Sequence, residues 1–178
     1  YYGGNDSDEG LNIAITQNNS IYISGLTQST NFPTYDYGSN SYYQDIFGGG
    51  FHDAFLLKFN ELGIRDLGTY FGGTDSDICW GMTIDTMDNV YLVGNTSSEN
   101  FPVQTSIPNS YIDSALNNSS SDMFISKFNQ NNHLVWSTYY GGEQTDVAED
   151  IAVNSKGELL ICGQSSSSDI PTFDAGNN

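Results

Sequence analysis

Basic side chains are scarce in this chain. Four Lys and Arg residues stand against 22 Asp and Glu residues, giving a formal net charge of −18. Such a charge repels phosphate backbones and anionic lipid headgroups, so we expect no nucleic acid partner and no membrane insertion. It attracts cations and favours solubility. Ca²⁺ is therefore the candidate cofactor, with simple solubilisation as the alternative explanation of the charge.

Cysteine and histidine are nearly absent, with two residues of each. Cys79 and Cys162 lie in short apolar stretches, so we expect two small buried thiols and no disulfide or metal pair. His52 and His133 lie in loop-like sequence, and no nucleophile elbow, zinc motif or phosphate-binding loop is present. We therefore expect this chain to be non-catalytic, while the full-length protein stays open on this point.

Long apolar runs and a helical period are also lacking. No stretch of about 18 apolar residues, the length that spans a membrane, occurs. Short apolar runs instead alternate with polar residues, which is typical of β-strands. Aromatic residues make up 13% of the chain, which is enough to build a core and argues against disorder. The fold class is predicted to be all-β.

A repeat with a constant period of 69 residues runs through the chain. Gly3-Gly4 returns as Gly72-Gly73 and as Gly141-Gly142. The words Phe32-Pro33 and Asp53-Ala54-Phe55 return at the same interval, as Phe101-Pro102 and Asp122-Met123-Phe124. A constant period indicates one supersecondary unit whose copies bury each other's faces.

Each unit is predicted to form four strands. In the second unit they are 80–85, 89–95, 122–129 and 134–140, with equivalent strands in the first unit at 11–16, 20–26, 53–60 and 64–71. The third unit has the first two, 149–154 and 158–164. Phe55 with Phe124, and Tyr70 with Tyr139, recur in register and are expected to pack between units. Trp80 and Trp136, which have no aromatic counterparts, are expected in the core.

Four antiparallel strands per repeat with Gly-rich corners predict β-propeller blades. The expected units are 3–71, 72–140 and an incomplete 141–178, so residues 1–178 form a partial β-propeller of about two and a half blades. Because a propeller closes with about 4 to 8 blades, the chain is expected to be part of a larger ring.

The recurring motifs resemble a known repeat. The pattern starts with a motif such as Ser137-Thr138-Tyr139-Tyr140-Gly141-Gly142 and continues with a strand, a turn and a strand. A motif such as Thr96 to Pro102 comes next, and the motif Asp-x-Phe-x-x-Lys-Phe-Asn follows it. This pattern resembles the SBBP repeat, the bacterial "seven-bladed β-propeller" repeat. The resemblance implies a large secreted or cell-surface bacterial protein with a structural or adhesive role, contacting other blades or domains, a protein or a surface glycan. The alternative is a carbohydrate-binding or carbohydrate-processing propeller with its active site in other blades.

An acidic loop follows each Gly-Gly pair and offers the candidate Ca²⁺ ligands. The side chains concerned are Asp6, Asp8, Asp75, Asp77 and Asp146. Alternating carboxylates on a tight loop can supply oxygens to Ca²⁺. The favoured alternative is that each repeated Asp caps its turn by accepting hydrogen bonds from backbone N–H groups.

The long segment between the second and third strands is rich in tyrosine. Tyr35, Tyr37, Tyr42 and Tyr43 are candidate ligand contacts, because tyrosine combines aromatic area with a hydrogen-bonding hydroxyl. The alternative is that these rings hold the segment against its own blade.

The composition, rich in Asn, Ser and Tyr, resembles proteins of the Bacteroidota. Asp85-Thr86-Met87 and Asp113-Ser114-Ala115 resemble that phylum's O-glycosylation motif, so Thr86 and Ser114 are candidate glycosylation sites.

Overall fold

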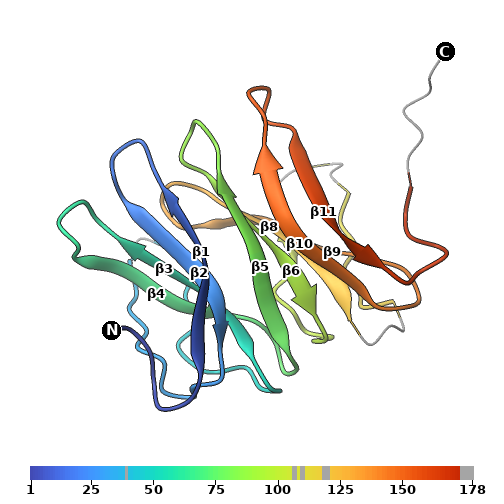
Figure 1. The fold of residues 1–178 in the computed structure, drawn as a ribbon, viewed down its shortest axis with the longest axis horizontal. Helices are drawn as coiled ribbons and strands as arrows, with labels where there is room; N and C mark the ends of the chain where they lie inside the picture. Colours follow the sequence, from blue (N-terminus) through green and yellow to red (C-terminus); the bar gives the residue numbers. More distant parts are fainter. Residues whose placement is uncertain (39, 106–107, 109–110, 118–120, 173–178) are drawn as a thin grey trace.

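The fold is all-β. The computed structural model describes residues 1–38, 40–105, 108, 111–117 and 121–172. Eleven strands form antiparallel sheets within these residues, and no helix there is long and apolar enough to cross a membrane. The sheets lie side by side in chain order, from the N-terminal sheet to the C-terminal strand pair (Figure 1).

The first two units form complete blades. The first sheet has the order β1-β2-β3-β4, made of Asp8–Ile15, Ile21–Thr27, Asp53–Phe59 and Arg65–Phe71. The second has the order β5-β6-β8-β9, made of Asp77–Ile84, Val90–Thr96, Asp122–Phe128 and Leu134–Tyr140. The short strand β7 (Gln104–Thr105) adds a fifth, outer strand to it. The third sheet pairs β10 (Asp146–Val153) with β11 (Leu159–Ser165).

A β-bulge recurs at the same place in the first strand of every unit. The register shifts past Leu11, Trp80 and Glu149, which occupy equivalent positions. All three side chains are exposed, so Leu, Trp and Glu are tolerated alike. The expectation of a core position for Trp80 was therefore wrong: its ring is 38% exposed, and its Nε1 donates to Asn95 Oδ1 at 2.7 Å.

The glycine opposite each bulge is required by close approach of the backbone. A Cβ on Gly25, Gly94 or Gly163 would lie 1.9, 1.8 or 2.0 Å from a main-chain oxygen of the bulged strand. The turns between the first two strands are equally regular, because Asn19, Asp88 and Gly157 all adopt positive φ, at 61°, 59° and 80°. Asn, Asp and Gly, the three residue types found at this position, are those that tolerate the left-handed conformation.

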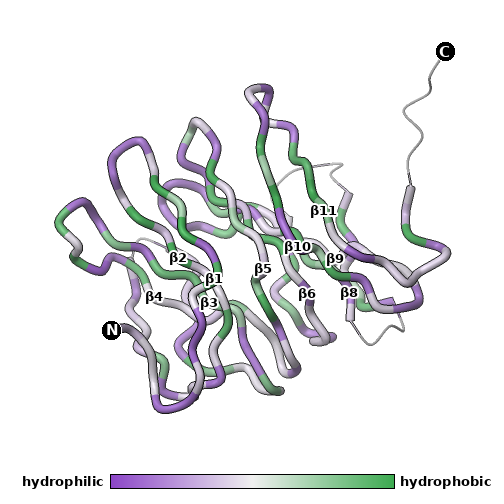
Figure 2. The backbone as a smooth tube through the Cα atoms, viewed as in Figure 1, coloured by the Kyte–Doolittle hydropathy of each residue, from purple (hydrophilic) through white to green (hydrophobic). Residues whose placement is uncertain are grey.

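Aromatic residues hold the first two blades together. Phe71 of the first sheet packs edge-on against Phe124 and Phe128 of the second, with ring centroids 5.9 and 5.2 Å apart. Alternate residues of each strand face the preceding and the following sheet, so Val90 and Leu92 join this core while Tyr91 and Val93 join the next one. Hydrophobic residues accordingly concentrate along the strands and hydrophilic ones at most turns (Figure 2). The predicted packing between units is confirmed for Phe124 and Tyr139, which belong to the core between the first two blades, whereas Phe55 and Tyr70 pack in a cluster of first-unit residues.

The two cysteines differ. Cys79 is fully buried in the core between the first two blades, whereas Cys162 on β11 is exposed, and neither forms a disulfide. The prediction of a buried thiol was wrong for Cys162. Its equivalent Val93 is buried only because the third sheet packs against it.

Candidate functional site

The repeated aspartate after each Gly-Gly pair caps its turn. Asp8, Asp77 and Asp146 accept a hydrogen bond through Oδ2 from the backbone N–H of Gly4, Gly73 and Gly142, at 2.7, 2.7 and 2.8 Å. A serine hydroxyl, of Ser29, Ser98 or Ser167, also donates to each carboxylate. The turn-cap interpretation is confirmed for all three positions.

Two of the predicted calcium ligands are placed differently from these caps. Asp6 and Asp75 are exposed on the loop surface, where their backbone N–H groups donate to Ser29 Oγ and Ser98 Oγ. Within the residues that the structure describes, no group of three or more His, Cys, Asp or Glu side chains is arranged to hold a metal ion. The calcium hypothesis stays a prediction.

A second buried aspartate, from the preceding blade, joins two of these caps, Asp77 and Asp146. Asp53, at the start of β3, and Asp77 both lie within about 3 Å of the same point, the place of a Cβ on Gly72. Burial raises the pKa of Asp53 to about 7, with a contribution from the charge of Asp77, and burial raises the pKa of Asp77 to about 6. One oxygen of each is buried without a hydrogen bond. The pair recurs as Asp122 and Asp146 around Gly141.

Sequence reasoning missed this pairing, although the signal was present. Asp53 and Asp122 are the first residues of the repeated motif of the third strand, but nothing in their spacing indicated contact with the next unit. The contact depends on the blades lying against each other, shown by the hydrogen bond from the Asp77 N–H to the His52 carbonyl, at 2.8 Å.

Three of the four candidate tyrosines are exposed on the long segment before β3. The exposed fractions of Tyr35, Tyr37 and Tyr43 are 49%, 39% and 38%. We call these three side chains the tyrosine row. Tyr35 exchanges backbone hydrogen bonds with Gly68, of 2.7 and 3.0 Å, which fastens the segment to the outer strand β4. The row is therefore carried on an anchored segment.

Basic side chains lie beside the tyrosine row. The Arg65 guanidinium is 5.0 Å from the Tyr35 ring centroid, and Lys58 Nζ is 5.2 Å from that of Tyr37. Each cation lies within the range of a cation–π contact. These contacts orient both rings; Arg65 is partly exposed, whereas Lys58 is buried.

Tyr42 has a different role from its neighbours. Its ring packs edge-on against Phe71 and Phe128, with centroids 5.3 and 5.9 Å away, and its N–H donates to the Asn132 carbonyl of the second blade at 2.9 Å. Tyr42 thus links the first two blades and lies apart from the exposed row.

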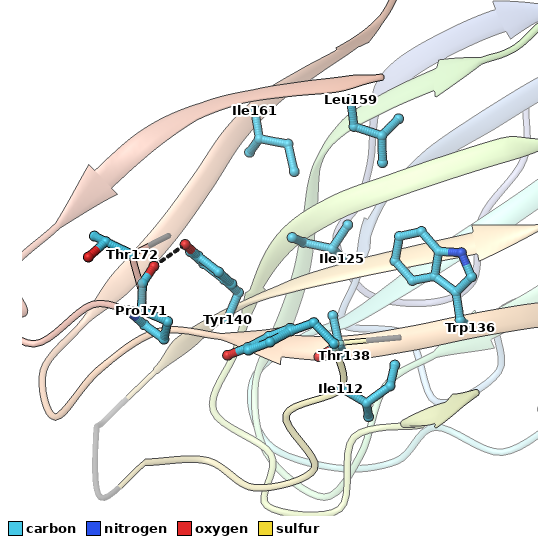
Figure 3. Close-up of a pocket in the computed structure, with 10 residues that line it drawn as sticks. Ile112, Ile125, Trp136, Thr138, Tyr140, Leu159, Ile161, Pro171 and Thr172 are labelled. Atoms are coloured by element: carbon cyan, nitrogen blue, oxygen red, sulfur yellow. Dashed lines mark hydrogen bonds between the residues drawn. The ribbon is translucent and has the colours of Figure 1, made fainter. Parts of the chain in front are cut away.

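An apolar cavity of about 700 Å³ opens between the second and third sheets (Figure 3). We call it the inter-sheet slot; its apolar walls include Ile125, Trp136, Tyr140, Leu159 and Ile161. Across it the Tyr140 hydroxyl donates to the Pro171 carbonyl.

The repeat reveals what occupies the equivalent space one blade earlier. The residues equivalent to those slot walls are Leu56, Leu67, Phe71, Val90 and Leu92, and all are at most 1% exposed. Phe124, Phe128, Leu134 and Tyr139, from β8 and β9, belong to the same core and cover them. The slot thus has the chemistry of a blade-packing surface, and nothing on its walls singles out a small ligand.

The two candidate glycosylation residues are both exposed. Thr86 lies in the turn between β5 and β6, where its carbonyl accepts from Gln17 Nε2 at 2.6 Å. Ser114 lies in the segment before β8. Their hydroxyl groups are accessible, and modification of either stays a prediction.

Comparison with known proteins identifies one repeat. A family model described as SBBP, beta-propeller repeat, matches residues 68–102, which are 35 of the 178 residues. The match runs from within β4 through the Gly72-Gly73 turn, β5 and β6, and ends at Phe101-Pro102. No curated protein matches the chain. The chain therefore contains an SBBP β-propeller repeat, and its sheets are consistent with blades of a partial β-propeller.

Proposed function

We propose that this chain is a non-catalytic structural or adhesive module of a large secreted or cell-surface protein of the Bacteroidota. Its rigid blades space other domains and present a contact surface to a protein or a surface glycan. The ring to which it contributes is the seven-bladed type that the repeat's name describes.

The tyrosine row is the observation that carries this proposal. Three half-exposed phenol rings stand on one anchored segment, and two of them lie against cations. Exposed tyrosine offers large, rigid contact area at low entropic cost, with a hydroxyl for hydrogen bonding. Such a surface suits recognition of sugars and proteins, whereas structural tyrosines such as Tyr42 are turned into the core.

A glycan array tests the contact role. We expect the wild-type chain to bind a restricted set of surface glycans, and the Tyr35→Ala/Tyr43→Ala variant to lose at least about tenfold in affinity. Tyr111→Ala is the matched control, because Tyr111 is 56% exposed but lies on the corresponding segment of the second blade. Equal binding by all three proteins would reject the tyrosine row as the contact surface.

The second candidate is a carbohydrate-processing propeller. The favouring observation is a polar pocket whose lining includes the rings of Tyr22 and Tyr37, the carboxylate of Asp88 and the amides of Asn18 and Gln130. Hydrolysis or elimination of a bound oligosaccharide would replace the non-catalytic proposal with this one.

Calcium is proposed as a weak ligand of the acidic loops. A cation that binds the folded state alone raises the melting temperature by mass action. We expect millimolar Ca²⁺ to raise the melting temperature relative to EDTA, and Asp75→Asn/Asp77→Asn to reduce that rise. No rise would leave Asp8, Asp77 and Asp146 as turn caps alone.

A further inference from the structure

A small polar pocket lies where the ends of the first two blades meet. Its volume is about 160 Å³, enough for about five waters at ~30 Å³ each. Its walls include Thr16, Asn18, Tyr22, Tyr37, Lys58 and Asp88. They come from both sheets, so the pocket forms only where the blades pack. We call it the lysine pocket.

Lys58 is the unusual group in this pocket. Its side chain is only 6% exposed, and its ammonium lies 5.3 and 5.2 Å from the ring centroids of Tyr22 and Tyr37. Nζ donates one long hydrogen bond, of 3.4 Å, to the Gln130 carbonyl. Burial lowers the pKa of Lys58, while Asp66 and Asp88 raise it through their charge. An ammonium has three donors, so this one retains capacity for a ligand oxygen.

The other walls supply complementary groups. Asp88 Oδ1 accepts from the Gln17 N–H at 3.0 Å, and a carboxylate can accept further hydrogen bonds. The Tyr22 hydroxyl donates to Asn132 Oδ1 at 2.6 Å, which leaves its oxygen able to accept. A donor and acceptors thus stand beside an aromatic face.

We propose that the lysine pocket binds a neutral saccharide, with Lys58 donating to one sugar hydroxyl, Asp88 accepting from another, and the Tyr37 ring packing against the sugar. The inference deepens the contact role proposed above and rests on it. A neutral ligand is favoured because Asp88 and the net charge of −18 repel an anion, while Lys58 repels a cation. Sugar hydroxyl groups donate and accept at once, so they match both charged walls.

The second blade offers a matched control. Lys127 is the repeat equivalent of Lys58, and its Nζ lies 5.1 Å from the Tyr91 ring centroid. Its surroundings include Met87 and Val135. Lys127→Met therefore removes the same charge from the same strand position, in a neighbouring pocket that shares Gln130 and Asn131 with the lysine pocket but not Tyr37, Lys58 or Asp88.

Two-dimensional ¹H–¹⁵N NMR titration tests the proposal. Glucose, galactose, mannose and N-acetylglucosamine are each added to the 178-residue chain. We expect at least one sugar to shift the amide signals of Lys58, Tyr37 and Asp88, with a Kd on the order of 1 mM, as suits a ligand of about a dozen heavy atoms. Lys58→Met should weaken binding about tenfold or more, because a charge-assisted hydrogen bond is lost. Lys127→Met should bind as wild type.

Asp88→Asn is a second variant that tests whether a loss of sugar binding comes from misfolding. Asparagine tolerates the positive φ of this position, as Asn19 does in the first blade, so the turn is kept while the charge is lost. This variant should melt as wild type yet bind the sugar several-fold more weakly. Sugar binding that survives both Lys58→Met and Asp88→Asn, or the absence of pocket shifts with every sugar, overturns the lysine pocket. The contact role itself fails only if glycan-array binding through the tyrosine row is also absent.

Discussion

At the residue scale, burial of the pair Asp53 and Asp77 carries an electrostatic cost. Both carboxyl groups are buried, and each has an oxygen without a hydrogen bond. The pKa of Asp53 rises from 3.8 to about 7 on burial. The folded chain therefore binds a proton more tightly than the unfolded chain, and stability is present at low pH and lost as pH rises from about 4 to about 7.

We predict that in EDTA the chain melts at a higher temperature at pH 5 than at pH 8. Asp53→Asn should flatten this dependence, because the amide carries no charge; at ~1.36 kcal/mol per pKa unit the effect between pH 5 and pH 8 is at most about 3 kcal/mol. Asp6→Asn, on an exposed loop, is the control for the general acidity of the chain. An unchanged pH profile in Asp53→Asn would contradict the assignment.

At the scale of the element, the repeated bulge and its facing glycine determine how the first strand pairs. A Cβ on Gly94 would lie 1.8 Å from the Ile78 carbonyl oxygen, whereas one on Gly10 would meet nothing closer than 3.4 Å. We predict that Gly94→Ala lowers the free energy of unfolding by about 1–3 kcal/mol or more, since the bulged backbone must move. Gly10→Ala should cost less than 1 kcal/mol. Urea unfolding measures the free energy of unfolding of both variants. Equal values would show that the bulged backbone moves at little energetic cost.

The sequence predicted the strands well but not everything around them. Strands two to four were placed within one residue, because alternation and closing glycines are local signals. The first strand begins three residues before the prediction, at Asp8, Asp77 and Asp146, because these polar residues pair in the ladder while also capping the turn. The short strand β7 was not predicted, because its two exposed residues show no alternation of apolar and polar side chains.

The candidate sites were less predictable than the strands. Tyr42 and Tyr43 are adjacent in sequence, yet one packs between blades and the other is exposed, which depends on the neighbouring sheet. The lysine pocket also depends on the neighbouring sheet, since Lys58 and Asp88 come from different blades. Recurrence at the repeat interval marks a residue as part of the unit, but it does not tell which residue of the next unit that residue contacts.

At the scale of the whole molecule, we predict that the inter-sheet slot accepts a hairpin of two further strands. A peptide with the sequence of residues 121–140, which includes β8 and β9, should dock there beside β11. At ten times its Kd it should raise the melting temperature by about 3–6 °C. A scrambled peptide is the control. Equal effects of both peptides would show that the slot does not select a blade hairpin.

The central claim is that the blades form a scaffold that binds without catalysis. The most direct measurement is to incubate the chain with the oligosaccharide it binds best on the array, and then analyse both by mass spectrometry. The account predicts saturable binding, reduced in Tyr35→Ala/Tyr43→Ala, and recovery of the oligosaccharide at its original mass. Shortened or unsaturated products formed by the wild-type chain would contradict it and make the protein an enzyme.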